Sequence, residues 1–429
     1  LMMSHGYNPE WSEGAIKSPI FQTSTFEFKT AEEGKRFFEL AYGHKNAEPD
    51  EKMGLIYSRI NNPDLEILES RLCLWDEADD AAVFASGMSA ISTVMLEFLN
   101  PGDLLLMSSP VYGGTDHFAK KVLNRFKINV IEFSALVTVR ESEQRVEDSG
   151  LSEKLTLIFA ETPGNPTNVM MDLEAISEIK QKYSTEEKPV IFAVDNTYLG
   201  PLWQHPLKHG ADLVVYSATK YIGGHSDLIA GAVLGSSALM VRVKTLRTFL
   251  GNMASPWTGW LLMRSLETLK VRMTQQAENA EILATYLDNH PLIEQVYYPS
   301  IMRKSDKNMD RIMKKQCLSN GAMISFDVCG GEKEAFAFLN NLSLVKLAVS
   351  LGSTESLAQH PATMTHVDVS EEGRQKMNIT GKLVRLSVGV ENAEDLKWDI
   401  DQALQAMSII HSVRCLRLTL ASIYTPPHT

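Results

Sequence analysis

A lysine behind two hydroxyl side chains stands in the stretch Ser217-Ala218-Thr219-Lys220, directly after the mostly apolar run 212–216. The amine of a lysine held in this way can form a Schiff base with an aldehyde cofactor, and the hydroxyls can hydrogen-bond a phosphate. A surface lysine after a strand is the alternative, and it would be preferred for any isolated lysine. The residues upstream therefore decide between the two interpretations.

Two earlier apolar runs end in groups that suit a flat, phosphorylated ligand. Ser86, Gly87 and Met88 follow the run 81–84 and open a predicted helix, where backbone amides attract phosphate and a glycine allows close approach. Tyr112 follows the run 104–107, and its ring can stack on a flat ligand ring. Turn chemistry and a partly buried tyrosine are the respective alternatives when each is taken alone.

Two more strand ends carry an amide and an acid. Asn165 stands in a Gly-Asn-Pro turn after the run 155–160, with its amide free to donate, although turn structure alone would also explain it. Asp195 follows the run 190–194, and a buried acid needs a partner such as a protonated pyridine nitrogen. A helix N-cap is the alternative role for Asp195. Jointly, the five strand ends predict a pyridoxal 5′-phosphate site with Lys220 as its Schiff-base lysine.

The elements that must position these groups alternate between strands and helices from residue 63 to residue 250. The predicted strands are 81–84, 104–107, 129–133, 155–160, 190–194, 213–216 and 230–234, and the predicted helices are 65–75, 89–99, 114–125 and 173–182. This rhythm predicts an α/β fold with a mostly parallel seven-stranded sheet and helices on both faces. Ligands of such sheets bind at the carboxyl ends of the strands, where the candidate residues fall.

Less regular segments flank this α/β region. Residues 1–62 read as an extended arm with one helix near 31–42, and an arm without its own core packs on something else, often another subunit. We assign residues 63–265 to the cofactor-binding domain and 266–407 to a smaller α+β domain with two or three strands. Residues 408–429 are predicted to be a less regular tail.

Composition limits the classes of partner. The 429-residue chain has a net charge of −12 and a pI near 5.5, which argues against nucleic acid or anionic membrane as a main partner. Its four cysteines form no C-x-x-C pair and its histidines no H-E-x-x-H motif, so no metal site is expected. Few cysteines, no membrane-spanning run and no signal-peptide pattern predict a cytoplasmic protein.

The chain resembles the cystathionine γ-synthase/γ-lyase family of Cys/Met-metabolism enzymes, which have the fold-type-I pyridoxal-phosphate transferase fold. The similarity runs from about residue 14 to residue 407. It is carried by Tyr57-Ser58-Arg59-Ile60-Asn61-Asn62-Pro63, Ser86-Gly87-Met88, Tyr112-Gly113-Gly114-Thr115, Glu161-Thr162-Pro163-Gly164-Asn165-Pro166-Thr167, Asp195-Asn196-Thr197, Ser217-Ala218-Thr219-Lys220, Val349-Ser350-Leu351-Gly352, His360-Pro361-Ala362-Thr363-Met364-Thr365-His366 and Arg385-Leu386-Ser387-Val388-Gly389.

The resemblance implies a role for each matching residue. Lys220, Tyr112 and Asp195 would be catalytic: Lys220 holds the cofactor and shuttles protons, Tyr112 stacks on the ring and acts as an acid or base, and Asp195 binds the ring nitrogen. Cofactor contacts would come from Tyr57, Arg59, Ser86, Gly87, Met88, Tyr112, Asn165, Asp195, Ser217, Thr219 and Lys220, with Tyr57 and Arg59 reaching the neighbouring subunit's phosphate. Arg385, Asn165 and Ser350 would bind the substrate carboxylate.

The resemblance also implies a homotetramer, built as a dimer of dimers with shared sites, acting on a sulfur amino acid. We expect γ-elimination on cystathionine or methionine, with γ-replacement by a synthase or sulfhydrylase as the alternative. An aminotransferase or an inactive scaffold is less favoured. Glu355 could meet a distal amino group, or it could equally be an exposed loop carboxylate.

Methionine γ-lyases that resemble this chain usually carry a cysteine two residues after the stacking tyrosine, whereas this chain has Gly114, so its Tyr-Gly-Gly-Thr run looks more like the cystathionine-cleaving or -forming branches. This sequence departs from the family pattern at Asp64, Ser265, the long segment 40–52 and the tail. None of these departures removes a catalytic group. Those in the arm bear on the shape of the active-site mouth and hence on the substrate.

Overall fold

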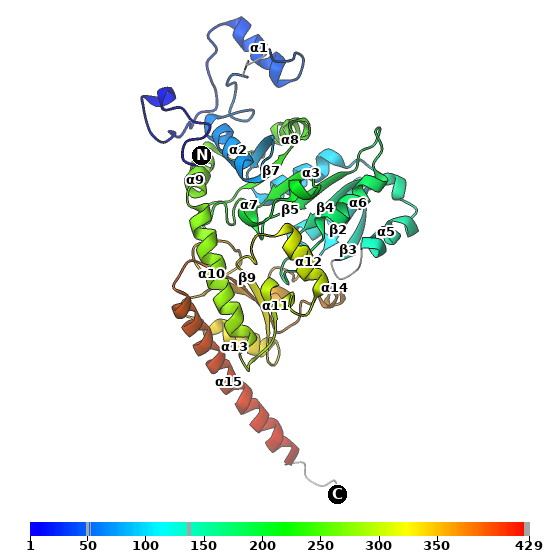
Figure 1. Ribbon diagram of the computed structural model, residues 1–429, viewed down its shortest axis with the longest axis vertical. Helices are drawn as coiled ribbons and strands as arrows, with labels where there is room; N and C mark the ends of the chain where they lie inside the picture. Colours follow the sequence, from blue (N-terminus) through cyan, green and yellow to red (C-terminus); the bar gives the residue numbers. More distant parts are fainter. Residues whose placement is uncertain (49–50, 52, 135–138, 424–429) are drawn as a thin grey trace.

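Two β-sheets organise the protein in a computed structural model that describes residues 1–48, 51, 53–134 and 139–423 (Figure 1). The larger sheet has seven strands in the order β1-β7-β6-β5-β4-β2-β3. Its strands are β1 (Asp80–Phe84), β2 (Leu104–Ser109), β3 (Asn129–Ser134), β4 (Leu155–Glu161), β5 (Ile191–Asp195), β6 (Leu213–Tyr216) and β7 (Gly231–Gly235). Strands β2 to β6 run parallel to one another, and β7 is antiparallel to both of its neighbours, β1 and β6. The predicted α/β class and the seven-stranded sheet are confirmed.

Helices cover both faces of this sheet because its apolar side chains alternate. Leu105 and Phe159 pack on one face against α3 (Gly87–Phe98) and α8 (Ser237–Leu250). Side chains of the opposite parity pack on the other face against further helices. Those helices include α2 (Pro63–Asp76), α6 (Leu173–Tyr183), α7 (Gly200–Trp203) and α9 (Pro256–Leu266). Burial of both faces explains why the strands read as continuous apolar runs.

The second sheet has five strands where the sequence predicted two or three. Their order is β10 (Lys346–Leu347), β11 (Leu357–Gln359), β12 (Leu383–Ser387), β9 (Met323–Val328) and β8 (Ile293–Tyr297). Side chains of α10 (Leu269–Asp288), α13 (Glu332–Asn340) and α15 (Ala393–Ile423) join its core. The two strands that the sequence did not reveal are β8, which mixes polar and apolar residues, and β11, which has only three residues. Smaller helices complete the described fold: α4 (Gly113–His117), α5 (Val139–Asp148), α11 (Pro299–Met302), α12 (Lys307–Gln316) and α14 (Glu371–Lys376).

Two segments project from the body of the molecule, the part of the arm around α1 and the C-terminal part of α15 (Figure 1). The arm carries the predicted helix as α1 (Ala31–Ala41), which stands apart from the sheets at the top of Figure 1. Part of the long segment 40–52, namely 49–50 and 52, lies outside the described residues. At the other end α15 continues to Ile423, so the predicted irregularity after Ser408 was wrong there. No glycine or proline occurs between Ser408 and Ile423 to stop the helix.

Neither a membrane span nor a metal cluster is found in the part of the chain that the structure describes. None of the helices there has both the length and the apolar character needed to cross a bilayer. No group of three or more His, Cys, Asp or Glu side chains there is arranged to hold a metal ion.

Candidate active site

A cavity of about 260 Å³ lies where the strands of the large sheet end. It is lined by Ser86, Gly87, Met88, Ile91, Tyr112, Glu161, Asn165, Asp195, Thr197, Tyr198, Ser217, Thr219, Lys220, Ile229 and Leu351. Most of these residues lie at or just after the ends of β1, β2, β4, β5 and β6, so the fold brings together all five strand ends singled out in the sequence. Nine of the lining residues were predicted to contact the cofactor.

The start of α3 forms one wall of the cavity. Ser86 caps the helix, and its Oγ accepts a hydrogen bond from the backbone N–H of Ser89 at 3.0 Å. The first amides of a helix have no intrahelical partner, which leaves the N–H groups of Gly87 and Met88 for an anion. A Cβ on Gly87 would lie 2.8 Å from Ser217 Cβ, so only glycine lets the helix approach the end of β6 this closely.

Asp195 places a buried acid at the end of β5. Its Oδ1 accepts hydrogen bonds from the backbone N–H and the hydroxyl of Thr197, at 3.0 and 2.6 Å. The Thr197 hydroxyl oxygen also accepts from Ser217 N at 2.9 Å, which links the ends of β5 and β6. Burial raises the pKa of Asp195 to about 6, and a cation facing this carboxyl would lower that pKa again.

Glu161 is a second buried acid in the same cavity and lies beside Asp195 in the register of β4 and β5. Its carboxylate accepts from Tyr112 N at 2.6 Å and from Asn165 N at 3.0 Å. Burial, followed by the negative charge of Asp195, raises the pKa of Glu161 to about 8. Glu161 thus ties the loop of the stacking tyrosine to the loop of Asn165.

Lys220 enters the cavity from the turn after β6. Its Nζ donates a hydrogen bond to Ser350 Oγ at 2.9 Å. Burial, followed by the positive charge of Arg385, lowers the pKa of Lys220 to about 8, so a large share of the amine is neutral near pH 8. A neutral amine is the nucleophilic form that attacks an aldehyde.

Arg385 lies behind Lys220 on β12 and is 3% exposed. Its Nη1 donates to Asn165 Oδ1 at 3.0 Å and its Nη2 to the carbonyl oxygen of Ser350 at 2.7 Å. Ser350 has φ +110°, a strained value for a residue with a side chain, and such strain occurs at functional sites. None of the ion pairs found among the described residues involves Arg385, so its guanidinium is a buried cation with polar but no carboxylate partners.

Tyr112 covers the mouth of the cavity with a ring that is 44% exposed. A Cβ on Gly114 would lie 2.6 Å from Tyr112 Cε1 and 3.1 Å from Met88 Sδ. The missing side chain at position 114 therefore makes room for the tyrosine ring in this position.

Ser350 and Arg385 lie outside the cavity lining but hydrogen-bond to the lining residues Lys220 and Asn165. Four other predicted site residues are also placed differently from the rest. Tyr57 and Arg59 do not line the cavity of their own chain: the guanidinium lies 5.6 Å from the tyrosine ring centre and donates to Thr248 O at 2.9 Å. Glu355 also lies outside the lining and accepts a hydrogen bond from the Ser226 hydroxyl. Thr219 lines the cavity, but its hydroxyl donates to Ala230 O at 3.1 Å.

Glu161, Thr197 and Tyr198 line the cavity but were not singled out as site residues in the sequence. Glu161 had an available signal, because it follows the buried run 155–160 just as Asp195 follows 190–194. Thr197 and Tyr198 stand two and three residues after Asp195. Their nearness to that acid in the sequence was the only sign of their place in the cavity lining.

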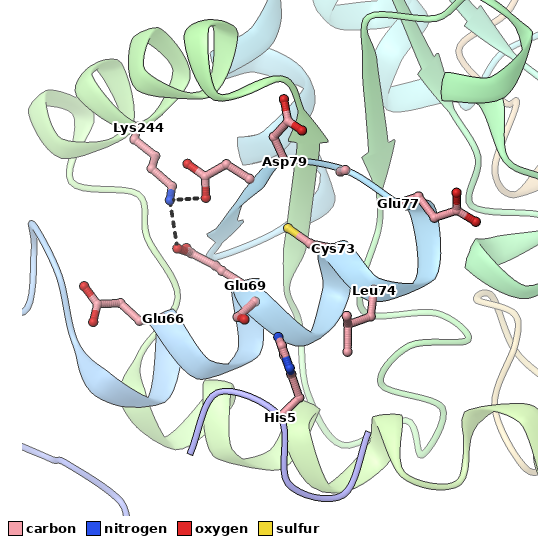
Figure 2. A pocket seen from close by; sticks show the side chains of 11 residues that line it. His5, Glu66, Glu69, Cys73, Leu74, Glu77, Asp79 and Lys244 are labelled. Atoms are coloured by element: carbon pink, nitrogen blue, oxygen red, sulfur yellow. Dashed lines mark hydrogen bonds and ion pairs between the residues drawn. The ribbon is translucent and has the colours of Figure 1, made fainter. Parts of the chain in front are cut away.

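A larger hollow lies elsewhere, between α2 and α8 (Figure 2). Its volume is about 640 Å³, and five of its eleven lining residues are acidic. Lys244, its only lysine, already pairs with Asp80 at 2.7 Å and with Glu69 at 3.3 Å (Figure 2). This negative lining disfavours a phosphate, so the smaller cavity at the strand ends is the better site for an anionic cofactor.

Comparison with known proteins identifies the family. The profile described as Cys/Met metabolism PLP-dependent enzyme matches residues 1–405. The chain belongs to this family. It is 38% identical to L-methionine gamma-lyase of Pseudomonas putida over 404 residues, covering 94% of this chain and 96% of that protein. It is 37% identical to cystathionine gamma-lyase of Bacillus subtilis, covering 94% and 98%. The crystal structure of cystathionine gamma synthase from Xanthomonas oryzae pv. oryzae in complex with aminoacrylate and cysteine has a TM-score of 0.84 at 32% identity, covering 95% of this chain and 97% of that chain.

The cofactor of this family is pyridoxal phosphate, and the cavity has the groups to hold it. The amides at the start of α3 and the uncrowded Gly87 suit its phosphate, and the face of Tyr112 suits its ring. Asp195 is a buried acid whose only hydrogen-bond donors among the described residues come from Thr197, which suits a ring-nitrogen cation. Lys220 supplies the amine. The donor set therefore fits the group.

Proposed function

We propose that this protein catalyses γ-elimination on a sulfur amino acid, methionine or cystathionine, and releases a 2-oxo acid, ammonia and a thiol. The names of the relatives support this reaction, since the proteins of Pseudomonas putida and Bacillus subtilis are called methionine and cystathionine gamma-lyases. The retained lysine, tyrosine and acid at the strand ends support an active enzyme rather than an inactive scaffold.

The observation that carries the proposal is the buried guanidinium of Arg385 beside the amine of Lys220. An α-amino acid has a carboxylate next to the carbon whose proton must be removed. The Arg385 fork can bind that carboxylate through two parallel hydrogen bonds, together with Asn165 and Ser350. Because Lys220 Nζ donates to Ser350 Oγ at 2.9 Å, the bound carboxylate would hold the α-carbon near the lysine.

The other residues act around this fixed carboxylate. Pyridoxal phosphate supplies an electron sink for the charge that develops when the α-proton leaves. Lys220 Nζ would take that proton, and Asp195 would keep a positive charge on the ring nitrogen. A second proton must leave Cβ so that its electron pair can expel the sulfur from Cγ. The Tyr112 hydroxyl would protonate the departing sulfur, which its place at the cavity mouth favours. Addition of water would then give the 2-oxo acid and ammonia.

γ-Replacement is the second candidate reaction, as in a cystathionine γ-synthase or an O-acylhomoserine sulfhydrylase. It is favoured by the likeness to the Xanthomonas cystathionine gamma synthase structure, and by Gly114 in place of the cysteine usual in methionine γ-lyases. Transamination remains less favoured, because the arm residues Tyr57 and Arg59 match the sulfur-amino-acid family.

We propose further that the protein acts in the cytoplasm as a homotetramer, a dimer of dimers with shared active sites. In this assembly the arm of one subunit brings Tyr57 and Arg59 to the cofactor phosphate of its neighbour. The absence of both residues from the cavity lining of their own chain supports this arrangement. The 1–62 arm, the 63–265 cofactor domain, the 266–407 domain and the 408–429 extension remain our proposed division of the chain.

The test incubates the purified holoenzyme separately with methionine, with cystathionine, with cysteine, and with an acylated homoserine plus cysteine. Ammonia, 2-oxobutanoate and thioether are measured over time. We expect steady release of 2-oxo acid from methionine or cystathionine. Thioether formation without steady 2-oxo acid release would overturn elimination in favour of replacement. Stoichiometric transfer of the amino group to an added 2-oxo acid would establish the aminotransferase.

A further inference from the structure

Asn165 has its side-chain oxygen held by two donors at the edge of the cavity. Arg385 Nη1 donates to Asn165 Oδ1 at 3.0 Å, and the Tyr198 hydroxyl donates to the same oxygen at 2.5 Å. All three side chains are at least nine-tenths buried. A buried polar atom that loses its hydrogen-bond partner is costly, so each of these contacts matters.

The chemistry of the two donors fixes which way the Asn165 amide faces. A guanidinium can only donate, so the atom facing Arg385 must be the amide oxygen. Burial raises the pKa of Tyr198, so its hydroxyl keeps its proton and also donates. With Oδ1 facing both donors, the Nδ2 group faces the other way and can donate to a ligand in the cavity that Asn165 lines.

Substrate binding would remove one of these two donors. If the substrate carboxylate takes the Arg385 fork, the guanidinium turns its donors from Asn165 to the ligand. Only Tyr198 then continues to hold Asn165 Oδ1 and to stop the amide from rotating. We propose that Tyr198 is a positioning residue: its hydroxyl keeps Asn165 Nδ2 directed at the substrate α-carboxylate after Arg385 has turned to that carboxylate. This inference rests on the proposed function only in taking an α-amino acid as the ligand.

The neighbouring residue Tyr221 offers a matched comparison. Its ring is also buried, at 1% exposure, and it directly follows Lys220 in the chain. Its hydroxyl has no hydrogen-bond partner among the described residues, whereas that of Tyr198 has Asn165. Tyr198→Phe and Tyr221→Phe therefore remove the same atom from two buried tyrosines, but only the first removes a contact to a proposed ligand-binding residue.

The experiment titrates the holoenzyme with two probes and follows the absorption of the bound cofactor. Norleucine has the chain length of methionine and a carboxylate, but no sulfur to eliminate. Pentylamine is the same molecule without its carboxylate. We expect Tyr198→Phe to weaken norleucine binding about three- to tenfold, the range of a single buried hydrogen bond, and to leave pentylamine binding within about twofold. We expect Tyr221→Phe to leave both within about twofold.

Two results would overturn the inference. One is unchanged norleucine binding in Tyr198→Phe, and the other is equal weakening of both probes, which would indicate a general disturbance of the cavity. Cofactor content and thermal unfolding of the two variants, compared with each other, check that Tyr198→Phe folds. The titration needs no turnover, so it still measures the carboxylate site if the proposed elimination reaction fails its own test.

Discussion

At the scale of single residues, the cavity is defined by ionisable groups that burial has moved away from their usual pKa values. The pKa of Lys220 falls to about 8, and those of Asp195 and Glu161 rise to about 6 and 8. Each shift favours the neutral form, because burial makes the charged form costly. A ligand with a ring cation and an aldehyde could pair its cation with Asp195 and react with the amine of Lys220.

The lowered pKa of Lys220 predicts how the apoprotein captures its cofactor. The amine is reactive only when neutral, and the neutral fraction grows as pH rises through about 8 and is nearly complete one to two units above that. We expect the rate of pyridoxal phosphate capture, followed by absorbance, to rise between pH 7 and 8.5 and to level off above about pH 9. An ordinary lysine would instead give about a tenfold rise per pH unit up to about pH 10.

Lys220→Ala is the control, because it removes the amine and should abolish capture at every pH. A continued rise in the wild-type rate beyond pH 10 would contradict a depressed lysine pKa.

The sequence revealed the site residues whose chemistry has a strong local signal. Lys220, Asp195 and Tyr112 each follow an apolar run, and a parallel sheet brings such positions to one edge. The contact of Tyr198 with Asn165 joins two loops far apart in the chain, so no spacing could have revealed it. Glu355 shows the converse: its identity fitted a distal amino group, but its hydrogen bond to Ser226 depends on how two loops pack.

At the scale of elements, the close approach of α3 to the end of β6 shapes the proposed phosphate site. The N-terminus of α3 must lie near the Ser217 turn for the helix amides and the turn hydroxyl to meet one phosphate. Gly87 permits this contact, since an added Cβ would lie 2.8 Å from Ser217 Cβ and 2.9 Å from its Oγ.

Gly87→Ala should therefore push α3 away from β6 and weaken cofactor binding. Overpacking of this kind costs about 1–3 kcal/mol. The strain falls where the phosphate would bind, so we expect the dissociation constant of pyridoxal phosphate to rise roughly tenfold. Fluorescence titration of the apoprotein measures it.

Gly381→Ala is the matched control, because a Cβ there would lie 3.9 Å from the nearest atom, Glu332 Cβ. Equal cofactor affinities for the two alanine variants would show that the contact of α3 with β6 does not shape the phosphate site.

Element prediction succeeded where the apolar runs were long. All seven strands of the large sheet were located to within two residues, because buried parallel strands leave continuous apolar runs between turn signals. It failed for β8, where polar residues interrupt the apolar pattern, and for β11, which has only three residues. The less regular tail predicted for 408–429 was wrong over 408–423, where α15 continues through a stretch without glycine or proline.

At the scale of the whole molecule, the arm is the part that a single chain leaves without an evident role. Its helix α1 stands away from the two sheets in Figure 1, and Tyr57 is 39% exposed. Arg59 lies outside the lining of its own cavity, although a cationic side chain there suits a phosphate. If Tyr57 and Arg59 contact the cofactor of a neighbouring subunit, the arm has a function that a single chain does not show.

Mixing two inactive variants tests whether the arm completes a neighbour's site. Arg59→Ala removes the arm contact, and Lys220→Ala removes the lysine. In a dimer of one chain of each kind, the Arg59→Ala chain keeps its own Lys220 and receives an intact Arg59 from its partner, so one of the two sites is whole. Random pairing makes half of the dimers mixed, so co-expression should restore about a quarter of the wild-type activity per site.

The combination of Lys220→Ala with Asp195→Ala separates this arrangement from a nonspecific effect of mixing. Both lesions lie in the cavity of one chain, so each site of a mixed dimer carries one of them, and no activity should return. If the Arg59 and Lys220 variants gave no more activity together than this control pair, then Arg59 would act within its own subunit. In that case the arm would have to fold back to reach the cavity of its own chain. Recovery near a quarter requires instead that Arg59 crosses between subunits, so that a single chain holds only part of each active site.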